Sequence, residues 1–164
     1  MNARRFVVAG TAAATALCLA APAMAQAPTG TLTFHEPASG GTFSIVDNAP
    51  KSRTHGERTR LSSKDAIVFS NPLQDATGKR AGTLRVICYI KKPGTFATAT
   101  SDCIGIFGLA TGNIYVSVLD QSFTESTTDG TIVGGTGAYV GAKGTMHSVS
   151  HRNDTSDDTL TLTP

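Results

Sequence analysis

Short runs of β-favouring residues, each closed by glycine, proline, asparagine or aspartate, dominate the chain from about residue 30 onward. No run shows the sustained 3.6-residue apolar period that an amphipathic helix requires. Eight or nine short strands with glycine-rich turns and no helix predict an all-β barrel or sandwich. The strands are expected at Thr31–Glu36, Thr42–Val46, Asp65–Ser70, Gly82–Lys91, Thr95–Leu109, Asn113–Asp120, Thr131–Val133, Lys143–His151 and Thr159–Thr163.

Local turn signals suggest how the first strands connect. Ser39-Gly40-Gly41 separates the first two runs and predicts that they form a hairpin. Asn71-Pro72 predicts the end of the third run, because proline lacks an N–H group and asparagine favours turns.

The apolar pattern in the middle of the chain favours a closed barrel over an open sheet with one solvent-exposed face. Cys103–Leu109 is apolar on both faces. A barrel with a lined interior and an oligomer face accounts for that pattern. Alternation through Gly82–Lys91 places four apolar side chains on one face: Leu84, Val86, Cys88 and Ile90.

The first 25 residues have the layout of a secretory signal peptide. Arg4 and Arg5 precede an apolar run from Phe6 to Ala21, and Ala23-Met24-Ala25 supplies a small-x-small cleavage site. The apolar run is shorter than the ~20 residues that span a membrane. We therefore expect cleavage after Ala25, a secreted or periplasmic location, and a single domain over residues 26–164 with no membrane span.

Charge excludes one class of partner. The whole chain carries a formal charge of +2, but without Arg4 and Arg5 its 12 remaining Lys and Arg balance 12 Asp and Glu. A neutral domain lacks the basic surface that nucleic-acid binding needs. An apolar content of 40% also argues against a fully disordered chain.

The cysteine count favours a disulfide. If Cys18 leaves with the signal peptide, Cys88 and Cys103 remain in an oxidising compartment. Pro93-Gly94 lies near their midpoint, so a turn over Lys91–Phe96 would bring them close to cross-strand register. Two buried free thiols are the alternative.

Several motifs favour structural roles. The glycine-rich run Gly134–Gly144 lacks the Gly-Lys-Ser/Thr ending of a phosphate-binding loop and is better explained by close packing at strand turns. His147 and His151 share one strand face but would lie ~13 Å apart, too far for one ion. We expect surface histidines, no metal and no cofactor.

One segment is basic. Asn48–Lys64 carries three arginines, two lysines and a histidine against a single glutamate. Such a stretch is usually a solvated loop. The functional alternative is a lid whose cations meet an anionic ligand group such as a carboxylate.

A set of ordered motifs resembles the allene oxide cyclase and dirigent superfamily, including its secreted bacterial members, over most of residues 31–164. The motifs are Val68–Leu73, Gly78–Gly82, Cys88, Phe107–Leu109, Gly112–Ile114, Ile132–Tyr139 and Gly141–Gly144. The resemblance implies an eight-stranded antiparallel barrel, commonly a homotrimer, with an apolar cavity in its mouth and no cofactor.

The resemblance also implies site residues. Glu36 matches a glutamate that stabilises developing positive charge during ring closure, and Asn71 matches an asparagine that holds a water on the substrate. Cys88 and, more loosely, Pro50 match pocket residues that contact the substrate. A second asparagine of the cyclase pattern is replaced here by Ala38, so part of the water-positioning set is missing.

Leu84 and Val86 share a strand face with Cys88, so we expect them to line the same cavity. The leading hypothesis is a secreted, cofactor-free barrel that binds a hydrophobic small molecule and acts as an isomerase of the cyclase type. The alternatives are a non-catalytic dirigent-like scaffold or carrier, and a structural surface protein with a filled barrel.

Overall fold

The computed structural model describes residues 29–48 and 60–164, which are almost entirely β-structure. The expected signal peptide, Pro50 and most of the basic segment 48–64 lie outside these ranges. Within them, one 3-10 helix, η2 (Gly137–Tyr139), accompanies eleven strands. The strands are β1 Gly30–Glu36, β2 Thr42–Val46, β3 Arg60–Leu61, β4 Ala66–Gln74, β5 Arg80–Lys92, β6 Gly94–Thr95, β7 Thr100–Leu109, β8 Gly112–Ser122, β9 Thr127–Gly135, β10 Lys143–Ser150 and β11 Ser156–Thr163.

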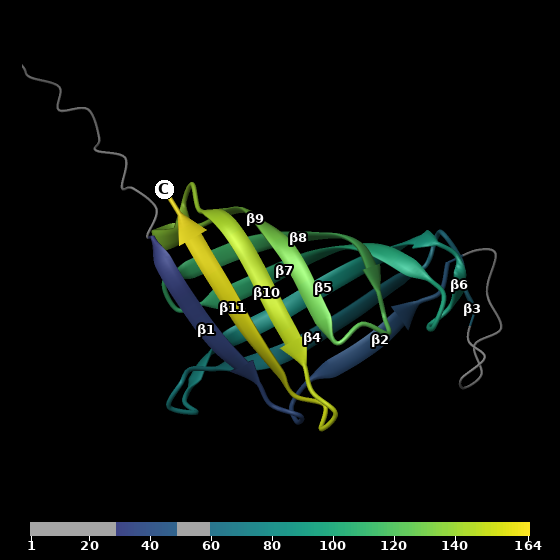
Figure 1. The fold of residues 1–164 in the computed structure, drawn as a ribbon, viewed down its shortest axis with the longest axis horizontal. Helices are drawn as coiled ribbons and strands as arrows, with labels where there is room; N and C mark the ends of the chain where they lie inside the picture. Colours follow the sequence, from purple (N-terminus) through teal and green to yellow (C-terminus); the bar gives the residue numbers. More distant parts are fainter. Residues whose placement is uncertain (1–28, 49–59) are drawn as a thin grey trace, which may run out of the picture.

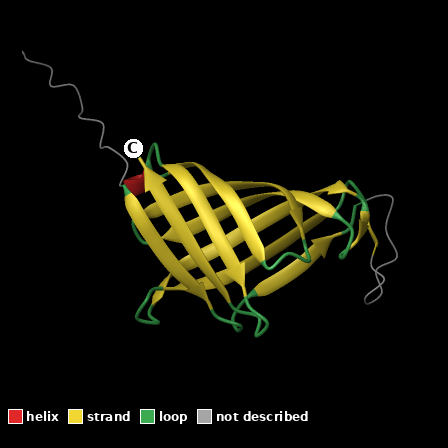
Figure 2. Cartoon of the chain, in the orientation of Figure 1, coloured by secondary structure: helices red, strands yellow, loops and turns green. Residues whose placement is uncertain are grey.

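Eight of these strands form a closed antiparallel barrel (Figures 1 and 2). The strands follow one another around the barrel in the order β1, β11, β10, β9, β8, β7, β5 and β4. The ring closes where His35 of β1 pairs with Gln74 of β4. The barrel expected from the strand pattern is confirmed, and closure leaves few free strand edges.

The expected hairpin between the first two runs is wrong. β1 pairs with β11 along its whole length, whereas β2 pairs with β4 from Thr42 to Val46. The segment around Ser39-Gly40-Gly41 therefore connects β1 to β2, which pairs with β4, without pairing β1 and β2 to each other. The same turn residues suit a hairpin and this connection equally well, so barrel closure decides which strands pair.

The expected strand end at Asn71-Pro72 is also wrong, because both residues lie inside β4 and pair with Leu84 and Thr83 of β5. On its other side, β4 pairs with β2 only up to Ser70, and with β1 only at Gln74. Pro72 lies between these two pairings, so it has no regular partner on this side of β4. The missing N–H group of proline is least costly at such a position. Asn71 can therefore present its side chain from a continuous strand.

The predicted disulfide is present between Cys88 of β5 and Cys103 of β7. The two residues are direct cross-strand partners, with Cα atoms 4.0 Å apart. The bond closes a loop with a sequence separation of 15. In the chain-entropy treatment, a loop of this size corresponds to about 3 kcal/mol of stabilisation.

The glycine-rich run has the structural role expected from its sequence. It contains the end of β9, the η2 turn and the beginning of β10. A Cβ atom on Gly135 would collide with backbone oxygens of Asn113 and Tyr139, and one on Gly137, whose φ is +59°, would meet the Thr111 carbonyl. Glycine is needed here because the backbones approach too closely for any side chain.

The barrel interior divides into a packed end and a hollow part. Side chains from opposite strands fill the packed end, and Leu73, Ile114 and Leu160 are completely inaccessible to solvent. Alternation places every second residue of each strand inward. In the hollow part, inward residues line a cavity. No helix among residues 29–48 and 60–164 has the length and hydropathy that a membrane span requires.

Candidate functional site

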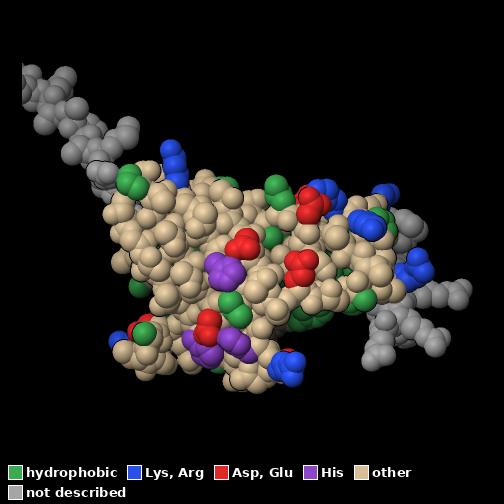
Figure 3. Space-filling view, in the orientation of Figure 1, with side chains coloured by type: hydrophobic (Ala, Val, Ile, Leu, Met, Phe, Trp, Pro, Cys, Tyr) green, Lys and Arg blue, Asp and Glu red, His purple; other side chains and the backbone are tan. Residues whose placement is uncertain are grey.

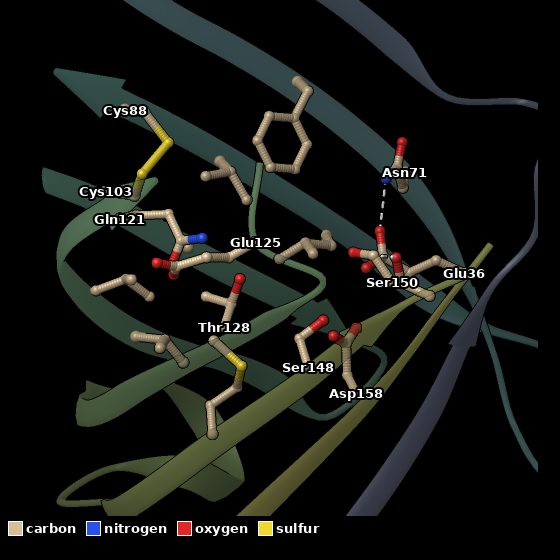
Figure 4. Close-up of a pocket in the computed structure, with 18 of the residues that line it drawn as sticks. Glu36, Asn71, Cys88, Cys103, Gln121, Glu125, Thr128, Ser148, Ser150 and Asp158 are labelled. Carbon is tan, nitrogen blue, oxygen red and sulfur yellow. Dashed lines mark hydrogen bonds between the residues drawn. A yellow bond between two sulfur atoms is a disulfide. The ribbon is translucent and has the colours of Figure 1, made fainter. Parts of the chain in front are cut away.

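The cavity inside the barrel has a volume of about 290 Å³ and combines a long apolar wall with a polar end (Figure 4). Residues of all eight barrel strands contribute to its lining, together with the connection between β8 and β9. Cavities that bind small molecules have this mixture of many apolar and few polar groups.

The apolar wall confirms the alternation expected for β5. Leu84, Val86 and Cys88 all line the cavity, as the sequence predicts. Cys88 contributes a disulfide sulfur rather than a thiol, so it offers no nucleophile. The remaining apolar lining includes Phe69, Cys103, Phe107, Val116, Val118, Phe123 and Met146.

Glu36 and Asn71 meet at the polar end, although 35 positions separate them in the sequence. Glu36 is the last residue of β1 and its side chain is only 5% exposed. The Asn71 amide nitrogen donates a hydrogen bond to Glu36 Oε2 at 2.5 Å. A Cβ on Gly41 would collide with the Asn71 side chain, so a glycine at that position gives the amide its room.

Asp158 of β11 completes the polar end, where Figure 4 shows it beside Ser148. It is 2% exposed, and its side chain interacts with Glu36 and Ser148. Within the described residues, its Oδ2 atom has no hydrogen-bond partner. Burial, followed by the nearby Glu36 charge, raises the pKa of Asp158 to about 8. The Asp158 carboxyl therefore keeps its proton at neutral pH.

Burial also raises the pKa of Glu36, while the hydrogen bonds from Asn71 and Asp158 act in the opposite direction. Because the contact between the two carboxyls lowers the pKa of Glu36 and raises that of Asp158, Glu36 is the member of the pair that ionises first. The polar end thus presents a protonated acid next to a carboxylate. Such a pair can give a proton to one atom of a bound molecule and accept a proton from another.

Hydroxyl and amide groups also belong to the lining, together with one further carboxylate. Glu125, on the connection between β8 and β9, is exposed to solvent. The hydroxyl and amide groups of the lining belong to Gln121, Ser122, Thr128, Ser148, Ser150 and Ser156. These groups can orient the polar part of a ligand.

Sequence reasoning missed Asp158 entirely. The last strand was expected to begin at Thr159, whereas β11 begins at Ser156. The available signal was the alternation Asp158, Leu160, Leu162, which places an acidic residue on the inward apolar face. An acidic residue in register with core leucines is the pattern of a buried functional carboxyl.

The histidines expected at the surface are there. His147 and His151 are half-exposed and lie against Asp129 and Asp157. Among the residues that the structure describes, no group of three or more His, Cys, Asp or Glu side chains has a geometry that could hold a metal ion.

Comparison with known proteins finds similarity to solved structures. No protein-family model matches the chain, and no curated protein matches its sequence. Among solved structures, a pyocyanin demethylase matches with a TM-score of 0.59 and 21% identity, over 81% of this chain and 99% of the other. A pterocarpan synthase dirigent protein matches with a TM-score of 0.48 and 16% identity, over 82% of this chain and 94% of the other.

The likeness to the demethylase is one of fold, because 21% identity does not carry an activity from one chain to another. It spans nearly the whole of that protein and most of this one. The chain therefore adopts the eight-stranded antiparallel barrel that its resemblance to the allene oxide cyclase and dirigent proteins implies.

Proposed function

We propose that this protein is a secreted or periplasmic, cofactor-free barrel that binds a hydrophobic small molecule and rearranges it by proton transfer, as an isomerase or cyclase. One observation carries the proposal. The cavity of about 290 Å³ has an apolar wall and ends in a buried acid–carboxylate pair, Asp158 and Glu36. An apolar cavity excludes water, and buried charges act more strongly there than in solution.

Each polar residue has a distinct part in this proposal. Asp158 gives its proton to the bound molecule, and Glu36 stabilises the positive charge that develops or accepts a proton in return. The amide of Asn71 holds the Glu36 carboxylate in place through its 2.5 Å hydrogen bond. When Glu36 accepts a proton from the molecule that Asp158 has protonated, the molecule keeps its atoms and its oxidation state, and the proton returns from Glu36 to Asp158 through the contact between them. Such a step is an intramolecular rearrangement and uses no redox partner.

The comparisons support a small-molecule role in general terms. A protein with this barrel fold is named for demethylating pyocyanin, so the fold can hold a site that acts on a small molecule. A homotrimer is part of the same proposal, because the resemblance to the allene oxide cyclases implies it.

The test of catalysis uses an unsaturated fatty epoxide, offered both as the free acid and as its methyl ester. We expect the protein to change the chirality of the cyclised product relative to buffer. Glu36→Gln should reduce this effect, and Asp157→Asn, which alters the outer face, should not. Identical product chirality with and without protein would exclude the cyclase, and full activity of Glu36→Gln would remove the role given to Glu36.

A non-catalytic carrier or dirigent-like scaffold is the second candidate. Ala38 replaces an asparagine of the cyclase pattern, and the Asn71 amide nitrogen is already engaged with Glu36. Both observations leave fewer groups to position a reactive water. Native mass spectrometry of the purified protein distinguishes the candidates, because a carrier retains an unchanged ligand whereas an enzyme releases a rearranged product. The same spectrum reports whether the protein is a trimer.

A further inference from the structure

The cavity lining carries charge of one sign only. Its ionisable side chains are all carboxylic: Glu36, Glu125 and Asp158. No lysine, arginine or histidine occurs among the described residues that line it. Charge in the chain as a whole is nearly balanced, with 14 Lys and Arg against 12 Asp and Glu, so the lining departs clearly from the composition.

Asp158 supplies a second and independent observation. Asp65, another buried aspartate, accepts backbone hydrogen bonds on both oxygens, from Asn48 and Ser62. Asp158 is equally buried, yet in the described part of the chain its Oδ2 has no partner and its carboxyl lines the cavity. A buried acceptor without a donor is costly, because it has lost its hydrogen bonds to water and gained none in return. A ligand that donates a hydrogen bond to Oδ2 would remove that cost.

Aromatic rings give a third indication. Phe69, Phe107 and Phe123 also line the cavity. The faces of aromatic rings are negative and attract cations, most strongly where water is excluded. A carboxylate ligand would gain no such attraction and would meet the Glu36 charge, which repels it.

We infer that the ligand carries a protonated amine or another organic cation on an apolar body, and that the cavity disfavours carboxylic acids of the same shape. The inference rests on the proposed function, since it names the ligand class of that site. It reverses the expectation that cations of the basic segment meet an anionic ligand. The cavity volume of about 290 Å³ lies at the lower end of small-molecule sites, so a body of one or two rings fits best.

Three probes of one shape test the inference: 2-naphthylmethylamine, 2-naphthylmethanol and 2-naphthoate. Their affinities are measured with the purified protein by calorimetry at pH 7 and 0.15 M salt. We expect the amine to bind at least about tenfold more tightly than the carboxylate, a difference that corresponds to ~1.4 kcal/mol. The affinity of the alcohol should lie between the two. Glu36→Gln should bring the affinity of the amine down toward that of the alcohol, and the matched outer-face variant Asp157→Asn should leave all three unchanged.

The outcomes separate this inference from the proposed function. A carboxylate that binds as tightly as the amine overturns the ligand class but leaves a small-molecule site. Failure of all three probes to bind overturns both. A Glu36→Gln protein that is folded by circular dichroism yet keeps the full preference for the amine also overturns the inference, because the preference would then arise elsewhere.

Discussion

Neighbouring residues of β1 and β11 face opposite sides of the barrel wall, and the pKa values of their acidic side chains shift in opposite directions. On the outside, His35 Nδ1 lies 2.7 Å from Asp157 Oδ1, and His151 Nε2 lies 2.8 Å from Asp157 Oδ2. These hydrogen bonds lower the pKa of Asp157. On the inside, burial raises the pKa of Asp158 to about 8, and Glu36 lies beside it instead of a cation.

The contrast shows that solvation, rather than residue type, decides what an aspartate does here. Asp157 and Asp158 are consecutive, but the strand alternation exposes one and buries the other. Histidine and acidic side chains lie next to one another on the outer face shown in Figure 3. Exposed pairs of this kind contribute little to stability. The inner pair holds a proton that water would otherwise remove.

The largest expected effect comes from neutralising the inner aspartate. The pKa of Asp158 is raised in the folded protein, so the folded state binds a proton that the unfolded state releases above pH 4. Stability should therefore fall as pH rises from about 4 to about 8, by ~1.4 kcal/mol per pH unit for one proton. Asp158→Asn removes this dependence and should stabilise the protein by several kcal/mol at pH 8 and above.

Urea unfolding between pH 4 and pH 9 measures this effect. The difference in unfolding free energy between Asp158→Asn and wild type should be small near pH 4 and should grow until about pH 8. The raised pKa of Glu36 leaves a smaller residual slope in the variant. Parallel pH profiles for the two proteins would show that Asp158 titrates normally.

The second prediction extends the comparison to groups without charge. Cys88 faces the cavity, whereas the next residue, Tyr89, is 56% exposed. Replacing both cysteines by alanine should cost about 3 kcal/mol, because the loop between them is no longer closed in the unfolded state. Tyr89→Ala on the outer face should change stability far less. Urea midpoints of the two variants, measured at pH 6, give the comparison.

The third prediction concerns the coupling inside the pair. The negative charge of Glu36 raises the pKa of Asp158, so Glu36→Gln should lower that pKa by on the order of one unit. The Asn71 amide keeps a side-chain oxygen to donate to in the variant. Carbon-13 chemical shifts of the Asp158 carboxyl, followed against pH, report the change directly. An unchanged titration midpoint would mean that burial alone sets the pKa.

Much of this comparison was accessible from the sequence. Alternation in the β5 segment predicts the inward face, and the Pro93-Gly94 turn predicts the cysteine pairing that the structure has. The motif resemblance places Glu36 and Asn71 at the pocket, where they contact each other. These features depend on local periodicity or on short motifs, so sequence alone suffices for them.

Features that depend on barrel closure were not accessible in the same way. The Gly40-Gly41 segment looks like a hairpin turn, but closure directs β1 to β11 and β2 to β4. Asn71-Pro72 looks like a strand end, but β4 continues through it because β5 pairs with it on one side. On the other side β4 has no regular partner at this point, so the proline is tolerated. Asp158 was missed because its role depends on its contact with Glu36, which comes from the opposite end of the chain.

The smallest expected effect belongs to the outer aspartate. Asp157→Asn removes the charge that His35 and His151 share, but all three side chains are at least 41% exposed, so water and salt replace most of the interaction. The loss should stay below about 1 kcal/mol. The lowered pKa of Asp157 means that its contribution is present above pH 4 and disappears as pH falls through the folded-state pKa. Unfolding free energies of wild type and Asp157→Asn at pH 3 and pH 6 should therefore converge at the lower pH, as they do for Asp158→Asn. At pH 6, however, Asp157→Asn should be less stable than wild type, whereas Asp158→Asn should be more stable. A loss of stability above about 2 kcal/mol at pH 6 would mean that the exposed Asp157 affects stability as strongly as a buried group. It would contradict the difference between the outer and inner aspartates.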